Sequence, residues 1–217
     1  MRFYSQYKQD QILYSRYFNK LSTNGFFIEI GAHNGEYLSN TLFYEESLNW
    51  NGICIEASPL LFLECKTRRK CLSLNYAICN NNGEASFLEL RGDPNPLSGL
   101  VDNYDNRHLE RIENHIKTIG GSGHLINVPT RKLQTILDEN NINEIHYLSI
   151  DTEGSELDIL KSIDFKKTFI HVVEIENNYP DTFQEIQNIL LLNGFIHDTN
   201  IDRDEIFVNS KSLLLDK

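Results

Sequence analysis

Acidic residues and glycines stand together where an apolar segment of this chain ends. Residues 26–30 are apolar except for Glu29, and they lead into the loop Gly31-Ala32-His33-Asn34-Gly35. Glycines at such a turn let the backbone approach a ligand closely. The carboxylate of Glu29 would repel a phosphate and attract an amine or a cation. The loop therefore predicts a site for a cationic or amine-bearing cofactor, although a tight turn alone would also require glycines.

Further acids follow other apolar segments of the chain. Glu56 ends the segment 52–56, Asp151 follows 146–150, and Glu176 with Asn177 follows 169–175. Because the carboxyl ends of parallel strands meet at one edge of a sheet, we expect these side chains to line one crevice. Glu56 also follows the glycine loop by the number of residues that is typical of an acid that accepts hydrogen bonds from ribose hydroxyls.

Strand and helix patterns alternate along the chain, which predicts an α/β fold with a mostly parallel sheet and helices on both faces. The predicted strands are 26–30, 52–56, 71–76, 85–90, 146–150, 169–175 and 205–208. The predicted helices are 7–19 at the N-terminus, 36–48, 59–69, 133–140, 156–163 and 182–192. The length of 217 residues and the 40% hydrophobic content fit one domain, 1–217.

Residues 91–127 interrupt this alternation with Gly, Pro, Asn and His and only a weakly helical middle. Such a stretch is typical of a substrate loop or lid, and a disordered insertion is the alternative. From its location, Tyr104, Arg107 and His108 could recognise sugar hydroxyls.

The formal charge of −11 argues against a nucleic-acid or anionic-membrane surface. No apolar stretch approaches the roughly 18 to 20 residues that span a bilayer, and residues 1–6 lack the apolar core of a signal peptide. We therefore expect a cytoplasmic protein without membrane insertion. The four cysteines show no Cys-x-x-Cys spacing, so reduced, mostly structural thiols are expected.

Common nucleotide templates fit this chain poorly. The glycine loop lacks the third glycine of G-x-G-x-x-G, and no G-x-x-x-x-G-K-[ST] occurs. S-adenosylmethionine fits better, because it carries a ribose, an amino group and a sulfonium charge but no phosphate.

In these features the sequence resembles the FkbM-type S-adenosylmethionine-dependent methyltransferases. The resemblance rests on motifs in a specific order and covers most of the chain except 91–127. These motifs are Ser5-Gln6 with Gln9-Asp10, 27–32 with Gly35, Ser39-Asn40-Thr41, Trp50 with Gly52, Ile55-Glu56 with Pro59, 148–157, Glu174-Ile175-Glu176-Asn177 and Gly194-Phe195.

The resemblance implies a Rossmann-like class I methyltransferase with a seven-stranded sheet, acting usually on oxygen and often on a sugar or polyketide. It implies that Glu29, Gly31 and Gly35 surround the methionine part, Glu56 holds the ribose and Ala77 lies near the adenine. Asn34 departs from the aspartate that is common in the family. The cofactor-binding residues implied are Glu29, Gly31, Ala32, Asn34, Gly35, Asn40, Glu56, Ala57, Ala77 and Asp151.

Methyl transfer to a weakly acidic hydroxyl needs a base or a Lewis acid. Asp151, Glu176 and Asn177 resemble the acid, acid and amide that bind Mg²⁺ in catechol-type O-methyltransferases, and Mg²⁺ or Mn²⁺ suits such oxygen ligands. The alternative is that Asp151 touches cofactor or substrate directly without a metal. Glu153 and His33 are the other candidate bases, each with a structural alternative.

These observations predict an S-adenosylmethionine-dependent O-methyltransferase whose acceptor is a hydroxyl of a sugar or glycan. A non-catalytic cofactor-binding module and an NAD-dependent or nucleotide-sugar oxidoreductase are the alternatives. The acids at 29, 56, 151 and 176 speak against the first. The absent third glycine and a missing Tyr-x-x-x-Lys disfavour the second.

Overall fold

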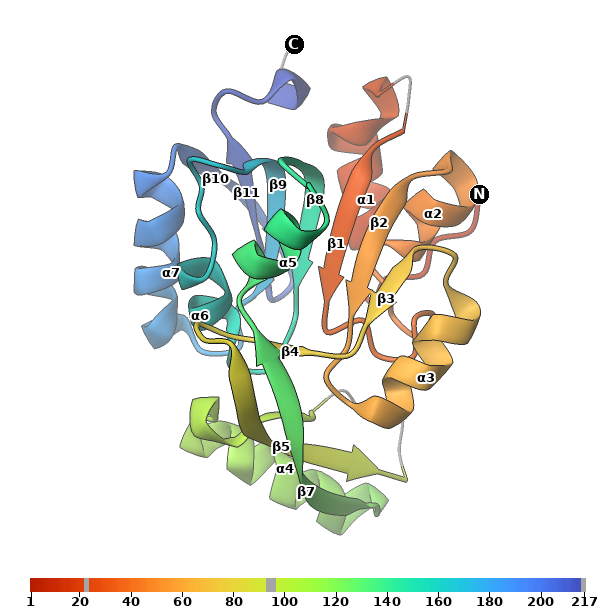
Figure 1. Cartoon of the computed structure of the whole chain (residues 1–217), viewed down its shortest axis with the longest axis vertical. Helices are drawn as coiled ribbons and strands as arrows, with labels where there is room; N and C mark the ends of the chain where they lie inside the picture. Colours follow the sequence, from red (N-terminus) through yellow and green to blue (C-terminus); the bar gives the residue numbers. More distant parts are fainter. Residues whose placement is uncertain (22–23, 93–96, 216–217) are drawn as a thin grey trace.

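A seven-stranded sheet forms the centre of the molecule, in a computed structural model that describes residues 1–21, 24–92 and 97–215 (Figure 1). Five neighbouring strands are parallel, and β11 is antiparallel to both of its neighbours. The predicted mostly parallel, Rossmann-like sheet is therefore confirmed. In spatial order the strands are β10 (Phe195–Ile201), β11 (Asp204–Asn209), β9 (Phe169–Glu176), β8 (Glu144–Ile150), β1 (Phe26–Ile30), β2 (Asn51–Ile55) and β3 (Leu72–Leu74).

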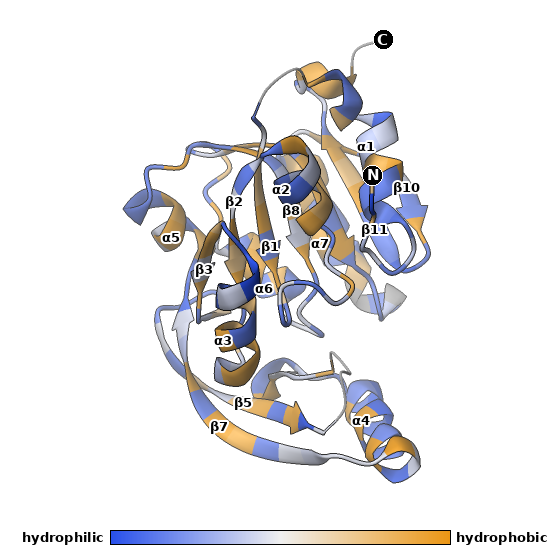
Figure 2. Ribbon diagram, turned by 90° about the vertical axis from the view of Figure 1, so that its right-hand side faces the viewer, coloured by the Kyte–Doolittle hydropathy of each residue, from blue (hydrophilic) through white to orange (hydrophobic). Residues whose placement is uncertain are grey.

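Helices cover both faces of this sheet, and the alternation of side chains along the strands explains why. In β1, Phe27 packs into one core, whereas Ile28 and Ile30 pack into the other. The first core includes residues of α1 (Gln9–Arg16), η1 (Phe18–Lys20), α2 (Leu42–Leu48) and α3 (Pro59–Arg68). The second includes residues of α5 (Leu133–Glu139), α6 (Glu156–Lys161) and α7 (Pro180–Leu192). Figure 2 shows the hydrophobic residues concentrated on the central strands.

Two predictions of position were wrong. The predicted strand 85–90 lies in a second sheet, and β10 supplies the seventh strand of the main sheet. The helix predicted from residue 36 begins only at Leu42, because residues 39–41 are held in an irregular conformation by hydrogen bonds to Glu29.

The second sheet has four strands and lies below the first (Figure 1). Its strands are β4 (Ala77–Ile78), β7 (Ser122–Arg131), β5 (Gly83–Arg91) and β6 (Gly99–Leu100). The short helix η2 (Val101–Asn103) and the 14-residue helix α4 (Asn106–Ile119) follow β6. Residues 93–96 lie outside the described part of the chain, and η3 (Leu213–Leu215) is the last described element.

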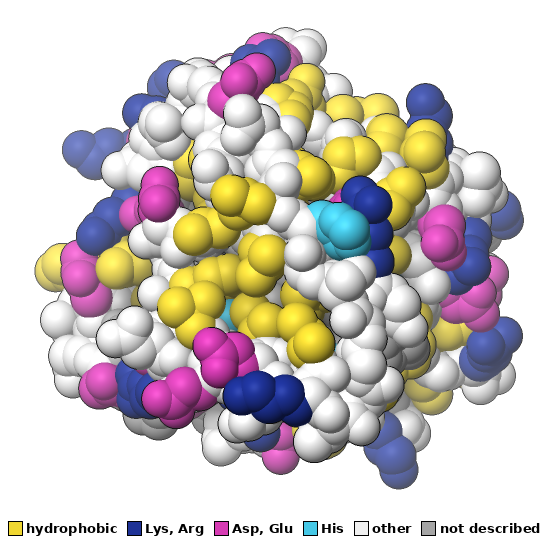
Figure 3. All heavy atoms as spheres, turned by 90° about the horizontal axis from the view of Figure 1, so that it is seen from below, with side chains coloured by type: hydrophobic (Ala, Val, Ile, Leu, Met, Phe, Trp, Pro, Cys, Tyr) yellow, Lys and Arg dark blue, Asp and Glu magenta, His cyan; other side chains and the backbone are white. Residues whose placement is uncertain are grey.

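The prediction of an irregular stretch over 91–127 was wrong for most of its described residues, whereas the weakly helical middle corresponds to α4. Asp105 caps α4 by accepting a hydrogen bond from the Arg107 amide, and Gly120 ends the helix. Strand β7 escaped prediction because its pairing with β5, whose partner residues are 31 to 47 positions away, supplies order that its Gly, His and Asn do not indicate. Seen from below, hydrophobic side chains gather near the centre of this face (Figure 3), and exposed apolar residues of α4 and β7 include Leu109, Ile119 and Leu125.

Within the described residues, no helix has the length and apolar character needed to cross a membrane.

The core of the main sheet predicts a large cost for truncating its central strand. Leu148 in β8 is 0% exposed, so Leu148→Ala should lower the free energy of unfolding by about 2–5 kcal/mol through lost burial and a residual cavity. Leu191→Ala, at a residue of α7 that is 46% exposed, should cost less than about 0.5 kcal/mol. Urea denaturation followed by circular dichroism measures both, and equal losses would contradict this account of the core.

Candidate functional site

Two adjoining cavities lie at the carboxyl edge of the main sheet. The larger, of about 380 Å³, is polar, and residues from β1, β8, β9, α4 and the N-terminal segment line it. The smaller, of about 70 Å³, is lined mainly by apolar residues, among them Ala57, Ala77 and Phe87. Gly31, His33 and Asp151 line both cavities, so the glycine loop and the end of β8 form their common wall.

Gly31 permits the close approach of two strand ends. Its φ of +86° is in the left-handed region, and a Cβ there would lie 1.7 Å from the carbonyl oxygen of Asp151. A side chain at this position would push the ends of β1 and β8 apart. Gly31 and Ala32 both line the larger cavity, where the cofactor contacts predicted for them would be possible.

Gly35 and Asn34 have structural roles in the protein, and the cofactor contacts expected of them remain predictions. A Cβ at Gly35 would lie 2.9 Å from Cγ of Arg69 and 3.0 Å from Cα of Cys65, so this glycine makes room for α3. The Oδ1 of Asn34 accepts hydrogen bonds from the amides of Glu36 and Tyr37, which closes a turn. Neither residue is among those that line the two cavities.

Glu29 is held by hydrogen bonds from within the protein, and its predicted cofactor contact remains a prediction. It lines the larger cavity, but its carboxylate already accepts hydrogen bonds from Ser39 Oγ, the Asn40 amide, Thr41 Oγ1 and Arg69 Nη1 at 2.7–3.0 Å. The oxygens that were expected to meet an amine are thus occupied by the protein. Glu29 therefore acts by holding residues 39–41 as a wall of the cavity.

Arg69 is the cation that neutralises this buried acid. Its side chain is fully buried and pairs with Glu29 at 2.9 Å and with Glu45 at 3.2 Å. Burial opposes the ionisation of Glu45, yet Arg69 and the Lys70 amide hold the pKa of Glu45 below its usual value. No local motif marks Arg69, because it lies at the C-terminal end of α3, 40 residues after its partner Glu29.

Asn40 presents an available acceptor to the larger cavity. Its amide nitrogen Nδ2 donates to Ser149 Oγ at 3.1 Å, while its buried Oδ1 has no hydrogen-bond partner among the described residues. A buried acceptor without a partner is costly unless a ligand or water satisfies it. This arrangement agrees with the predicted cofactor contact of Asn40.

Glu56 sits in the wall of the smaller cavity and orders the glycine loop. Its carboxylate accepts hydrogen bonds from the amides of His33 and Ser58, both at 2.8 Å. Burial raises the pKa of Glu56 to about 7, although these amides oppose the shift. Ala57 and Ala77 line the same cavity, and the cofactor contacts that the resemblance implied for them remain predictions.

The larger cavity contains an acidic floor. Carboxylate oxygens of Asp151, Glu153 and Glu176 lie within 4.8 Å of one another. Burial, followed by the neighbouring negative charges, raises the pKa of both Asp151 and Glu176 well above the usual range. Two such close carboxyl groups favour sharing one proton, with one protonated and the other ionised.

Glu153 is already partnered within this floor. Its Oε2 lies 3.2 Å from Nη1 of Arg111, 3.2 Å from Nδ1 of His108 and 3.0 Å from Nδ2 of Asn178. Its φ of +57° is unusual for a residue with a side chain and fits a constrained position. Its partners thus hold α4 against the end of β8.

The predicted metal ligand Asn177 points elsewhere. Its Nδ2 donates to Glu205 at 3.1 Å, and Asn177 is not among the described residues that line the larger cavity. The antiparallel neighbour β11 draws this amide away from Asp151, which a parallel-edge argument could not foresee. The acid, acid and amide set of the prediction is therefore not assembled.

Comparison with known proteins now identifies the family. The profile of the FkbM methyltransferase domain matches residues 29–197. The chain belongs to the FkbM methyltransferase family. No curated protein matches it.

Solved methyltransferases of low sequence identity resemble this FkbM domain. The FkbM methyltransferase from Methylobacillus flagellatus KT is 14% identical, with a TM-score of 0.48, and the match covers 85% of this chain and 43% of that one. The human methyltransferase 10 domain containing protein is 11% identical, with a TM-score of 0.45 and coverage of 93% and 78%. The chain thus spans less than half the length of the M. flagellatus protein.

Helix α4 of the FkbM domain supplies cavity residues that the motif search missed. Arg111, His115 and Ile119 line the larger cavity, and their spacing of four residues places them on one face of the helix. The spacing of four residues could have predicted a helix with these side chains on one face, but the surrounding Gly, Pro, Asn and His residues indicated a loop.

The residues first expected to recognise sugars have different contacts. Tyr104 Oη and His108 Nε2 both lie within hydrogen-bond distance of the Leu97 carbonyl, and Arg107 pairs with Asp105 and Asp181. These contacts fix the position of α4, and none of the three residues is among those that line the larger cavity, so their recognition of a sugar remains a prediction.

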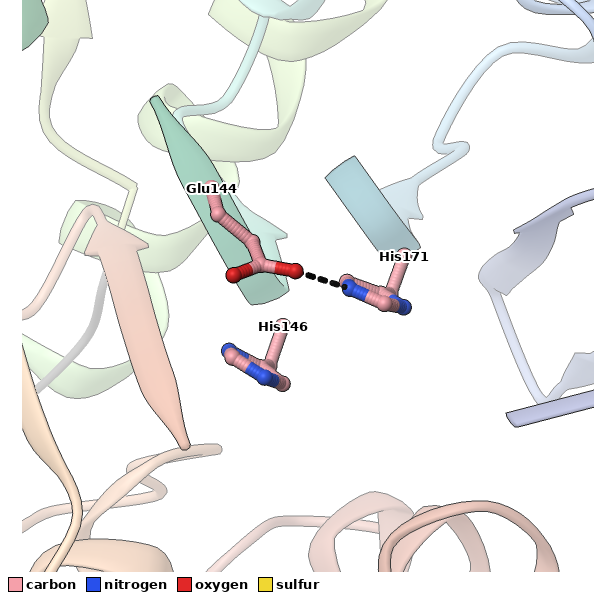
Figure 4. A group of neighbouring side chains, drawn as sticks. All are labelled: Glu144, His146 and His171. Carbon is pink, nitrogen blue, oxygen red and sulfur yellow. Dashed lines mark hydrogen bonds and ion pairs between the residues drawn. The ribbon is translucent and has the colours of Figure 1, made fainter. Parts of the chain in front are cut away.

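A second acid and histidine group lies near the opposite ends of β8 and β9 (Figure 4). His171 Nε2 lies 3.0 Å from Glu144 Oε1 and its Nδ1 lies 2.8 Å from Ser212 Oγ, while His146 Nδ1 accepts a hydrogen bond from the Phe26 amide. The two rings are stacked, 4.9 Å apart and 8° from parallel. Lone pairs of stacked imidazoles lie in separate planes, so this group suits hydrogen bonding better than chelation.

The buried ion pairs predict a contrast between two adjacent arginines. Arg69→Met leaves Glu29 and Glu45 buried without their cation and should lower the free energy of unfolding by about 3–5 kcal/mol. Arg68→Met removes an exposed pair with Glu64 and should cost less than about 1 kcal/mol. Urea denaturation of both variants measures the difference, and similar stabilities would show that Arg69 does not organise the wall.

Proposed function

We propose that this FkbM domain transfers a methyl group from S-adenosylmethionine to a hydroxyl group of a sugar or glycan. The observation that carries the proposal is the pair of adjoining cavities, one mainly apolar and one polar, that share Gly31, His33 and Asp151. A cofactor in the first would meet an acceptor in the second at this common wall.

The smaller cavity fits the nucleoside part of the cofactor. Ala57, Ala77 and Phe87 offer an apolar slot for a flat base, and the carboxylate of Glu56 offers acceptors for ribose hydroxyls. In the larger cavity, Asn40 Oδ1 and the acidic floor suit an amino group and a positive charge. When bound, S-adenosylmethionine supplies a methyl group on a positively charged sulfur.

The larger cavity fits a hydroxylated acceptor. Polar side chains of Gln6, Arg111 and His115 contribute to its lining, and so do the half-exposed rings of Tyr7 and Tyr37. Hydrogen-bonding groups with a few aromatic surfaces suit a sugar, which has hydroxyl groups around apolar ring faces. The acceptor would be bound and oriented by these residues.

The acidic floor provides the proton acceptor in this proposal. The ionised member of the Asp151 and Glu176 pair takes the proton from the acceptor hydroxyl as its oxygen approaches the methyl group. Glu153 positions α4 through Arg111 and is not the base. His33, at the junction of the cavities, remains the second candidate base.

The residues of the chain do not form the predicted set of ligands for Mg²⁺ or Mn²⁺. Asn177 is directed to Glu205, and Glu153 is neutralised by Arg111, which leaves only Asp151 and Glu176, two carboxyl groups that are hydrogen-bonded to each other. No step of the proposed reaction therefore passes through a metal ion.

Cofactor binding tests the first half of the proposal. S-adenosylhomocysteine, the demethylated cofactor, should bind with micromolar affinity in calorimetry, and NAD should not. Glu56→Ala should weaken that binding about tenfold by removing hydrogen bonds to a charged acceptor, whereas Glu84→Ala, at an exposed residue of β5, should not. Absence of S-adenosylhomocysteine binding to the wild type would refute the proposal.

The same titration has a pH dependence with a defined sign. In the free protein Glu56 titrates at about 7, and ribose hydroxyls donate to its ionised form. The affinity of the wild type should therefore rise as the pH is raised through 7, with release of a proton on binding. Glu56→Ala should lose this dependence.

Removal of metal ions with EDTA distinguishes proton removal by the acid pair from proton removal assisted by a metal ion. Transfer of labelled methyl groups to a panel of mono- and oligosaccharides should persist in EDTA, because the acid pair supplies the base. Asp151→Ala should reduce the rate about 100-fold or more, and Glu84→Ala should not. Activity that EDTA abolishes and Mg²⁺ restores would establish the metal route instead, and activity on no sugar would remove the acceptor class.

A further inference from the structure

Three cysteines cluster on the α3 side of the main sheet, outside the proposed reaction. Cys54 in β2 and Cys65 in α3 are fully buried, and Cys71, between α3 and β3, is half-buried. The sulfur atoms of Cys54 and Cys71 lie 3.5 Å apart. A disulfide bond needs about 2.05 Å, so the two sulfurs would have to approach each other by about 1.5 Å to bond.

The two thiols differ in their surroundings. The buried guanidinium of Arg69 interacts with both Cys54 and Cys71, but burial raises the pKa of the Cys54 thiol well above its usual value, which keeps Cys54 protonated. Cys71 is the member that solvent can reach, whereas Cys54 is 0% exposed. An oxidant from solution would therefore meet Cys71 first, with Cys54 already beside it.

The cysteine pair is also joined to the wall of the larger cavity. Cys54 Sγ donates a hydrogen bond to Glu29 Oε2 at 3.7 Å, and the Cys71 amide donates to Glu45 Oε2 at 3.2 Å. Glu29 and Glu45 are the two acids that pair with Arg69. Movement of the two sulfurs toward each other would therefore act on the network that holds residues 39–41.

We propose that Cys54 and Cys71 form an oxidation-sensitive site that closes to a disulfide and thereby weakens cofactor binding. The closure of the disulfide is independent of the proposed function, and only its effect on the cofactor rests on it.

The chemistry needs a peroxide as oxidant. The Cys71 thiolate attacks one peroxide oxygen, breaks the O–O bond and becomes a sulfenic acid, while the other oxygen leaves as water. The Cys54 sulfur then attacks the Cys71 sulfur, and the hydroxyl group leaves with the Cys54 proton as a second water molecule. Two thiols lose two electrons and two protons in total, and hydrogen peroxide is reduced to two molecules of water.

Cys79 provides a matched control within the same chain. It is buried like Cys54, and its thiol donates to Asn81 Oδ1 at 2.9 Å. It lies apart from the three clustered cysteines and packs with Ala77 and Phe87 of the second sheet. Cys79→Ser therefore removes a buried thiol without touching the proposed pair.

Mass spectrometry of the whole chain after treatment with hydrogen peroxide tests the site. The wild type and Cys79→Ser should lose two hydrogen atoms, about 2 Da, and peptide mapping should find Cys54 joined to Cys71. Cys71→Ser, at the half-buried position where a folded protein is expected, should not form this bond. No loss of mass in the wild type, or a bond that uses Cys65, would overturn the proposal.

Calorimetry on the same samples tests the link to the cofactor wall. Oxidation should weaken binding of S-adenosylhomocysteine about fivefold, as expected for groups in one hydrogen-bond network, and dithiothreitol should restore it. Cys71→Ser should bind equally before and after peroxide. A disulfide that forms without changing the affinity would refute the coupling, whereas failure of the reduced wild type to bind would refute the proposed function and leave the mass result to decide the disulfide.

Discussion

The buried ion pair between Glu29 and Arg69 is the interaction on which the site depends. An acid inside the first β-strand is costly unless a cation and hydrogen-bond donors surround it, and here the donors come from residues 39–41. The same contacts that satisfy Glu29 prevent these residues from joining α2. The shape of the larger cavity is thus a consequence of neutralising one buried charge.

A second constraint operates at the ends of the parallel strands. Gly31 lets β1 approach the Asp151 carbonyl, and the parallel register of β8 and β9 brings Asp151 and Glu176 to one edge. Burial makes the ionisation of both acids unfavourable, and their proximity adds to that cost. A close pair of raised pKa values is what a proton acceptor at neutral pH requires.

Local patterns were sufficient to predict most strands of the main sheet and the acids at their ends. Short apolar runs identify β1, β8 and β9, and a parallel sheet then gathers Asp151 and Glu176 at one edge. Motif matching failed where a residue's partner is distant in the chain. Gly35 makes room for α3, Asn177 turns to β11, and both partnerships depend on tertiary packing that no local pattern contains.

The two cavities, proposed to hold the cofactor and the acceptor, are built from different kinds of structure. Residues that face the smaller cavity come largely from strand ends and from the β5 and β7 sheet, whereas Arg111, His115 and Ile119 come from α4. Helix α4 is held by its contacts to Glu153, Asp181 and the Leu97 carbonyl, which lie on its first two turns. Substitutions farther along its cavity face can therefore change the acceptor while the strands that would hold the cofactor stay as they are.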